Sequence, residues 1–427
     1  MTWINRHVEE IKHVIQRALR SGVLDIGFAS FLTRLTALAQ RILLARILGA
    51  ENIGHIAVVS SVLSLIRLPA GAGTFTVVNK LVAENSEDIS IQQKVIGTSL
   101  WVNLVTTLLV GVVAWYVLSG TAWVNDIVAK GLLLMLLPLL PLMIFVEIMK
   151  NALMGQRRMK ICARIDITIS ILAILGVVPM AYYWSINGWL YNQVLLMILA
   201  GLLLCWALRS ILSLKWNNEF AKKIASFGTF AFLGQLVGVL ILQFDTLCIS
   251  KIIKDSSITG IYNTAALIAQ QLMFIPISIT TIVFPFVAQN KNDIRKLKKR
   301  YSELTIIIGS LAIIMAISVW VLCPFFFPWF GRDFVQSVWP FRILAIGFIA
   351  QSLYVLDNTY LDALGRTDIT FVTGLVAMVI NIVLNISFIT RWGMIGAAWA
   401  TCTSMICSLI LRRIVVHQII FKRQLIR

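Results

Sequence analysis

Cationic side chains within long apolar stretches are the residues of this sequence whose chemistry most needs an explanation. Arg34, Arg41 and Arg67 lie in the first two apolar stretches, and Arg34 and Arg41 are separated by two helical turns. Both side chains therefore project from one face of a helix, about 10 Å apart along its axis. A guanidinium stays protonated and binds phosphate oxygens bidentately, which makes the three arginines candidate ligands for a phosphate-containing substrate. The alternative is that Arg41 extends outward to a polar surface and Arg67 pairs with a carboxylate.

Ionisable residues in later apolar stretches form a second group of candidates. Asp245 and Asp357 are isolated carboxylates, and Glu147 lies one helical turn before Lys150. A charge within an apolar helix that spans a membrane costs roughly 2.5–3.5 kcal/mol, so each one needs a function or a partner. A buried carboxylate can bind a proton or Na⁺, so Asp245, Asp357 and Glu147, with Lys150 beside it, are candidates for ion coupling or gating. The alternative is neutralisation by salt bridges, which for Glu147 and Lys150 would join the two residues to each other.

The elements that carry these residues are long apolar helices. The sequence is 59% hydrophobic and 13% charged, whereas a soluble domain carries roughly 25% charged residues. A membrane-spanning helix needs about 20 predominantly apolar residues. The sequence therefore predicts an all-α polytopic membrane protein with about twelve transmembrane helices. They are expected at about 24–46, 55–78, 96–118, 131–153, 163–184, 190–211, 226–249, 260–288, 303–323, 338–363, 368–390 and 393–415.

Lysines and arginines are distributed unevenly between the connections. Most of the 37 fall in the two termini and in every second connection. Because cytoplasmic loops of membrane proteins retain such cations, we expect both termini in the cytoplasm. Residues 1–22 are expected to form an amphipathic helix on the inner membrane surface. The net charge of +18 is spread over many short loops, which indicates contact with anionic membrane lipids and not with nucleic acid.

An internal repeat divides the sequence into two halves. Matched positions recur at a nearly constant offset: Gln40 and Asp245, Arg46 and Lys251, Gly54 and Gly260, Pro69 and Pro276, Gly155 and Gly365, Gly188 and Gly393. Parallel repeats of this kind build transporters with a substrate cavity between two lobes. We therefore expect an N-lobe at 23–213, a cytoplasmic linker at 214–225, a C-lobe at 226–416 and a basic cytoplasmic tail at 417–427.

Two local motifs connect this architecture to a known family. The turn after the first apolar stretch reads Leu-Ala-Arg-Ile-Leu-Gly-Ala-Glu-Asn-Ile-Gly, and the second stretch ends in Pro-Ala-Gly-Ala-Gly. Together with the two six-helix halves, these motifs resemble the polysaccharide transporters of the multidrug/oligosaccharidyl-lipid/polysaccharide (MOP) exporter superfamily, and within it the O-antigen (Wzx-type) flippases. The resemblance covers about residues 24–413. It implies two six-helix lobes in a MATE-like V-shaped arrangement.

The resemblance also implies a function. The protein would move an undecaprenyl-diphosphate-linked O-antigen or polysaccharide repeat unit from the cytoplasmic to the periplasmic leaflet of a bacterial inner membrane, by ion-coupled alternating access. Arg34, Arg41 and Arg67 would bind the diphosphate–sugar head, and Asp25 and Arg164 would meet it near the cytoplasmic entrance. The expected coupling ion is H⁺ or Na⁺. A polysaccharide polymerase and a chain-length regulator are the expected protein partners.

Two other functions compete with this interpretation. A multidrug or other lipid-linked precursor exporter of the same superfamily is the first, but an acidic cavity for cationic drugs is difficult to reconcile with Arg34 and Arg67. A membrane polysaccharide polymerase is the second, and it would need a large periplasmic loop, whereas the longest one expected here is about 323–337. The sequence contains no phosphate-binding P-loop, and its six cysteines are dispersed. We therefore expect a transporter without catalytic residues, metal site or cofactor.

Overall fold

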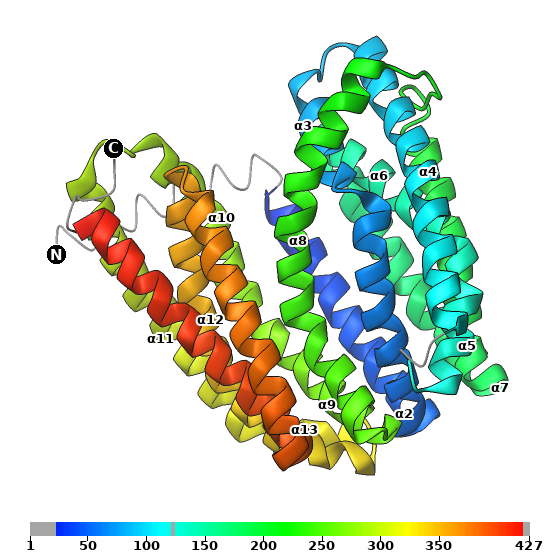
Figure 1. Cartoon of the computed structure of the whole chain (residues 1–427), viewed down its shortest axis with the longest axis vertical. Coiled ribbons are helices and arrows are strands. Elements are labelled where there is room, and N and C mark those ends of the chain that lie inside the picture. The colour runs from blue at the N-terminus through cyan, green and yellow to red at the C-terminus, as the bar shows by residue number, and fades with distance from the viewer. Residues whose placement is uncertain (1–22, 121–123, 422–427) are drawn as a thin grey trace. The chain divides into compact units, whose positions relative to one another are not determined.

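The computed structural model describes residues 23–120 and 124–421, and these residues form a helical membrane protein (Figure 1). The regular secondary structure in these two ranges consists of helices without any strand. Nine of the helices described there are long and apolar enough to cross a membrane. The prediction of an all-α polytopic membrane protein is therefore confirmed. The expected amphipathic helix at 1–22 and the last part of the expected tail, 422–427, lie outside the described residues.

The helices follow the chain with short connections. The α-helices are α2 (Val23–Gly71), α3 (Thr74–Glu84), α4 (Ile89–Gly120), α5 (Ile127–Leu136), α6 (Leu140–Gly155), α7 (Met159–Ala207), α8 (Asn218–Ile253), α9 (Ser256–Gln270), α10 (Phe274–Gln289), α11 (Ile294–Phe326), α12 (Val338–Ala363) and α13 (Thr367–Phe421). Short 3₁₀ segments lie at η1 (Leu137–Leu139), η2 (Gln271–Met273), η3 (Phe327–Trp329) and η4 (Arg332–Ser337).

Three of the expected connections consist of a single non-helical residue between two helical segments, and α2, α7 and α13 each contain two such segments. α2 breaks at Gly49 (φ 76°), α7 at Ser185 (φ 52°) and α13 at Gly393 (φ 57°). A positive φ reverses the helical path within one residue, and glycine adopts it without steric cost. The breaks fall at or beside the turns expected between the first and second, fifth and sixth, and eleventh and twelfth spans. The exact number of twelve spans stays a prediction.

The backbone also corrects the register of the internal repeat. The residue equivalent to Gly393 is Ser185, because both have the same unusual backbone conformation (ψ −138° and −132°). The turn residue equivalent to Gly365 (φ 81°) is Arg157 (φ 58°). The matches of Gly188 with Gly393 and of Gly155 with Gly365 are therefore wrong by two or three positions. In both pairs the second half has glycine and the first half has a longer residue, so residue identity does not reveal the equivalence.

Contacts between Cα atoms divide the chain into two compact units. Unit 1 comprises Met1–Ile47, Ile66–Ser119 and Leu134–Phe232, and unit 2 comprises Leu48–Leu65, Gly120–Leu133 and Leu233–Arg427. Two stretches of the expected N-lobe thus belong to unit 2, and the lobe boundaries at 23–213 and 226–416 stay a prediction. In unit 1, α6 packs against α3 and α7, and in unit 2, α12 packs against α11 and α13 (Figure 1).

A close helix–helix approach joins the inserted stretch 48–65 to the rest of unit 2. A Cβ atom on Gly54 would lie 1.7 Å from the backbone oxygen of Ser256, and one on Gly260 would lie 2.2 Å from that of Ala50. Only glycine fits at both positions, since such distances are far below van der Waals contact. The predicted match of Gly54 with Gly260 therefore marks two equivalent helix starts that pack against each other.

Candidate functional site

Arg67 and Glu147 form an ion pair in unit 1. Arg67 lies near the C-terminal end of α2, and its Nη2 donates to Oε1 of Glu147 on α6 over 2.8 Å. The two side chains remain 35% and 38% exposed. The contact agrees with the alternative in which Arg67 pairs with a carboxylate. Both groups nevertheless remain accessible to a ligand, because neither is enclosed by protein.

Lys150 has a different partner from the one in the salt-bridge alternative. Its Nζ donates to Oδ1 of Asp166 on α7 over 2.8 Å, and these side chains are 37% and 39% exposed. In place of a pair between Glu147 and Lys150, the structure has two pairs, one from Glu147 to α2 and one from Lys150 to α7. Two side chains on neighbouring helices can point directly at each other, whereas a pair on one helix must both turn along the helix axis to meet.

The remaining predicted substrate ligands lie on the same unit. Arg34 on α2 and Arg164 on α7 have exposed side chains, and Arg41 is partly buried. The side chain of Asp25 lies outside the described residues. Among the side chains described in these apolar helices, cations outnumber the carboxylates Glu147 and Asp166. Unit 1 therefore has an excess of positive charge inside or beside its membrane-spanning segments.

Asp245 lies at the centre of a buried hydrogen-bond network in unit 2. It is on α8 and is 5% exposed. Its Oδ2 accepts from the Tyr262 hydroxyl over 2.7 Å and from the Thr401 hydroxyl, and its Oδ1 accepts from Nδ2 of Asn385 over 2.7 Å. These donors, from α9 and α13, are all neutral. The negative charge of Asp245 is thus solvated by hydrogen bonds but not balanced by a cation from the described residues.

The same network presents oxygen atoms with spare acceptor capacity. Asn385 Oδ1 is buried and has no hydrogen-bond partner among the described residues, and Nδ2 of Asn385 also donates to Oδ1 of Asn381 over 3.0 Å. Carboxylate, amide and hydroxyl oxygens are the ligands that hard cations prefer. The Asp245 network can therefore hold a proton on its carboxylate or a small cation among its oxygens.

Asp357, unlike Asp245, has a cationic partner. It is fully buried on α12, where its Oδ1 accepts from the Tyr301 hydroxyl over 2.7 Å. Its Oδ2 lies 3.1 Å from Nε of Arg413 on α13, in an ion pair. The carboxylate is thus neutralised within the C-terminal half itself. This arrangement favours a structural role for Asp357 over ion coupling.

Two neighbouring arginines of α13, Arg412 and Arg413, were not among the residues predicted from the sequence. Arg413 neutralises Asp357, and Arg412 is only 4% exposed. The Arg412 guanidinium donates from Nε to the Thr373 hydroxyl over 3.1 Å and from Nη1 to Ser408 over 2.5 Å, and it lies 4.5 Å from the centre of the Tyr354 ring. Their position in the sequence could have identified them as intramembrane residues, because both lie before the end of the last expected span, 393–415.

A second missed group anchors the stretch 124–126. Oδ2 of Asp126 lies 2.5 Å from Nδ1 of His55 and accepts from the Ser256 hydroxyl over 2.9 Å, while its Oδ1 accepts from the Ala129 amide over 2.9 Å. The Asp126 side chain is only 6% exposed. Burial alone would raise the pKa of Asp126, but the hydrogen bonds from His55 and the Ala129 amide outweigh it and hold the pKa below its ordinary value.

Comparison with known proteins relates this arrangement to a family. Residues 43–338 match the family described as polysaccharide biosynthesis protein. The probable low-salt glycan biosynthesis flippase Agl15 of Haloferax volcanii is 21% identical over 378 residues, which are 86% of this chain and 77% of that protein. A putative O-antigen transporter of Shigella flexneri is 23% identical over 188 residues, 42% of each chain.

Solved structures share the fold. An inward-facing multidrug resistance MATE family transporter of the MOP superfamily superposes with a TM-score of 0.77 at 15% identity, covering 92% of this chain and 96% of the other. The lipid II flippase MurJ in an inward closed conformation gives 0.74 at 16% identity, covering 92% and 87%. These relatives are named as flippases and transporters, in agreement with the prediction of a transporter and not an enzyme. The chain belongs to the polysaccharide biosynthesis protein family and has the fold of the MOP-superfamily transporters.

Proposed function

We propose that the protein is a flippase for a lipid-diphosphate-linked oligosaccharide. The cargo would be an undecaprenyl-linked O-antigen or related polysaccharide repeat unit, moved from the cytoplasmic to the periplasmic leaflet of a bacterial inner membrane. The observation that carries the proposal is the excess of accessible cationic side chains on the apolar helices of unit 1, at Arg34, Arg67 and Arg164. Anionic cargo is the class of substrate that such a surface binds.

Arg67 can exchange its protein partner for the cargo. An ion pair with both side chains more than a third exposed contributes only about 0–1 kcal/mol. A guanidinium–phosphate contact is charge-assisted and bidentate, and it is stronger than a single contact to a carboxylate. The diphosphate would therefore displace Glu147 from Arg67 on binding, and Glu147 would recapture Arg67 on release. This exchange keeps Arg67 partnered in both states and makes Glu147 a gating residue.

Asp245 is the residue that we assign to ion coupling. Its carboxylate has only neutral donors around it, and the vacant acceptor on Asn385 is next to it. H⁺ or Na⁺ would neutralise the charge, so occupancy of the site would change the packing of α8, α9 and α13. Asp357 lacks this property because Arg413 already neutralises it. A polymerase and a chain-length regulator would receive the cargo on the periplasmic side.

The test is complementation of a deletion in the native organism. Surface polysaccharide is read on a gel, and lipid-linked sugars are extracted and quantified. We expect the deletion to lose the polysaccharide and to accumulate single repeat units in the cytoplasmic leaflet. Arg34→Ala and Arg67→Ala should each reduce complementation about tenfold or more, the loss expected for one charge-assisted contact. Arg67→Lys should retain part of the activity.

Arg209→Ala is the matched control, since Arg209 is exposed in the turn after α7. It removes one positive charge from unit 1 without changing the apolar helices, and it should complement fully. Unchanged polysaccharide in the deletion strain, together with new sensitivity to cationic drugs, would overturn the proposal and favour a multidrug exporter. Equal loss in Arg209→Ala and Arg67→Ala would show that total charge, and not a site, is what matters.

A further inference from the structure

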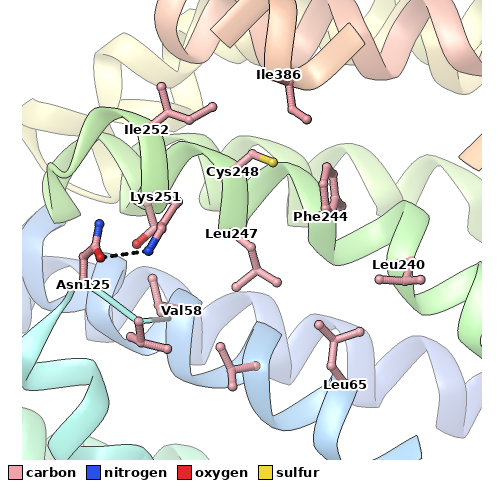
Figure 2. A pocket seen from close by; sticks show the side chains of 13 residues that line it. Val58, Leu65, Asn125, Leu240, Phe244, Leu247, Cys248, Lys251, Ile252 and Ile386 are labelled. Carbon is pink, nitrogen blue, oxygen red and sulfur yellow. Dashed lines mark hydrogen bonds between the residues drawn. The ribbon is translucent and has the colours of Figure 1, made fainter. Parts of the chain in front are cut away.

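An apolar pocket with one cationic end lies within unit 2 (Figure 2). Its volume is about 410 Å³, and none of its lining residues belongs to the Asp245 or Asp357 networks. Apolar cavities of about 150 Å³ already bind benzene-sized molecules, so this space holds a considerably longer hydrocarbon. The walls come from three helices: Val58 and Leu65 of α2, Phe244 and Leu247 of α8, and Ile386 of α13.

The polar end of the pocket is formed by Lys251 and Asn125. Lys251 is exposed in the last turn of α8, and its Nζ donates to Oδ1 of Asn125 over 3.0 Å (Figure 2). The figure shows this pair at one end of the pocket, with Leu240 and Leu65 toward the other. The lining thus changes along the pocket from a single cation to hydrocarbon.

Asn125 is held in place by its neighbour in the chain. Asp126 is bound by His55 on α2, by Ser256 at the start of α9 and by the amide of Ala129. These contacts fix the stretch 124–126 between two helices. Lys251 therefore has a preorganised partner, and its ammonium is held at one end of the pocket before any ligand arrives. Preorganisation of this kind reduces the entropy lost on binding.

The chemistry of this pocket selects an amphiphile with a negative head. A lysine ammonium is a compact point charge that binds phosphate, and hydrocarbon walls bind an acyl chain through the hydrophobic effect. One lysine balances one negative charge, which matches the phosphodiester monoanion of a glycerophospholipid better than a diphosphate. The orientation predicted from the loop charges puts this end of α8 on the periplasmic side, where outer-leaflet head groups would lie.

We propose that the pocket between α2, α8 and α13 binds an anionic glycerophospholipid, with Lys251 on its phosphate and one acyl chain among Val58, Leu65, Phe244, Leu247 and Ile386. This lipid is distinct from the transported glycolipid. The bound lipid would contact both the stretch 48–65 of α2 and α8, and would therefore stabilise the packing of these two elements. Membrane composition would then affect the stability and rate of the protein.

The test is native mass spectrometry of the purified full-length protein in detergent, titrated with phosphatidylglycerol and, separately, with phosphatidylethanolamine. We expect one phosphatidylglycerol to remain bound and to outcompete phosphatidylethanolamine. Lys251→Ala should weaken phosphatidylglycerol about tenfold, the effect of one charge-assisted contact. Lys254→Ala is the matched control, because Lys254 is exposed one turn away and does not line the pocket; it should bind like the unmodified protein.

A second variant tests the acyl-chain site without removing a charge. Ile386 is 51% exposed at the edge of the pocket, so Ile386→Trp should fold and fill the space from outside. It should abolish the bound phosphatidylglycerol while sparing the Lys251–Asn125 contact. Unaltered binding in both variants would refute the site. Preferential retention of undecaprenyl phosphate over phosphatidylglycerol, lost in Lys251→Ala, would instead assign the pocket to the transported lipid and overturn the phospholipid proposal without affecting the flippase proposal.

Discussion

Removal of the Arg413 guanidinium should leave the buried carboxylate of Asp357 without its neutralising cation. Asp357 is fully buried, and its Oδ2 lies 3.1 Å from Arg413 Nε. Breaking a buried pair by deleting one partner costs about 3–5 kcal/mol, because the remaining charge has lost its neutralising partner. Tyr301 still donates to Oδ1 of Asp357 over 2.7 Å, and Arg413 is itself 28% exposed. We therefore expect Arg413→Ala to lower the free energy of unfolding by about 3 kcal/mol, the lower end of that range.

The reverse change should cost less, and the two changes should be coupled. Asp357→Asn keeps an acceptor for Tyr301 and leaves a partly exposed cation, which costs about 1–2 kcal/mol. The double variant should be less destabilised than the sum of the two, with an interaction energy of about 2 kcal/mol, because neither charge is then stranded.

Unfolding in mixed micelles with graded sodium dodecyl sulfate measures these differences. Arg366→Ala is the control, because Arg366 pairs with Asp368 at 3.2 Å and the two side chains are 31% and 63% exposed. Exposed pairs contribute about 0–1 kcal/mol, so its effect should be small. A loss below 1 kcal/mol in Arg413→Ala, or strict additivity in the double variant, would refute a structural ion pair. Asp357 would then return as a candidate for ion coupling.

Three further predictions concern coupling, backbone and pH. Asp245→Asn keeps the hydrogen-bonding shape but removes the charge, so glycolipid transport in vesicles should lose its dependence on an imposed H⁺ or Na⁺ gradient while the protein remains folded. Ser185→Gly should raise the free energy of unfolding by about 1 kcal/mol because it relieves a positive φ, and Gly393→Ser should lower it by a similar amount; opposite signs would contradict the repeat register. Because the folded pKa of Asp126 is depressed, its contribution to stability is complete above about pH 4 and is lost as pH falls through the folded pKa. Thermal unfolding between pH 3 and 6 should show this dependence in the wild type and not in Asp126→Asn.

Much of the fold could be predicted because it depends on local properties. Long apolar stretches and uneven loop charges respond to the membrane itself, so composition and order were sufficient to find them. The Gly54 and Gly260 match was also readable, since each is required by a close helix approach. The matches at Gly155 and Gly188 failed because identity was sought where only backbone conformation is shared. Arg157 and Ser185 adopt positive φ values without being glycine.

The salt-bridge partners of Glu147 and Lys150 could not be predicted from the spacing of these residues in the sequence. Glu147 and Lys150 are one turn apart, and the i, i+3 rule favours a pair. Their observed partners lie on other helices: Arg67 is on α2, 80 residues from Glu147, and Asp166 is on the next helix, α7, 16 residues from Lys150. A contact across two packed helices depends on the rotation of each helix about its axis. That rotation is set by packing, which the sequence pattern of an all-round apolar helix does not encode.

The internal repeat places different polar residues at equivalent positions of the two halves. In unit 1, Gln40, Ala173 and Gln193 line a cavity of about 260 Å³. The corrected repeat relates these three positions, in order, to Asp245, Asn381 and Thr401. The same helical frame thus holds a neutral amide in one half and a carboxylate network in the other. A carboxylate at position 40 would add a negative charge next to Arg41 in the sequence, whereas the carboxylate at position 245 of unit 2 can bind a cation. In the proposed function, this difference would let an anionic cargo bind the arginines of unit 1 and a coupling cation bind Asp245 in unit 2 without direct competition.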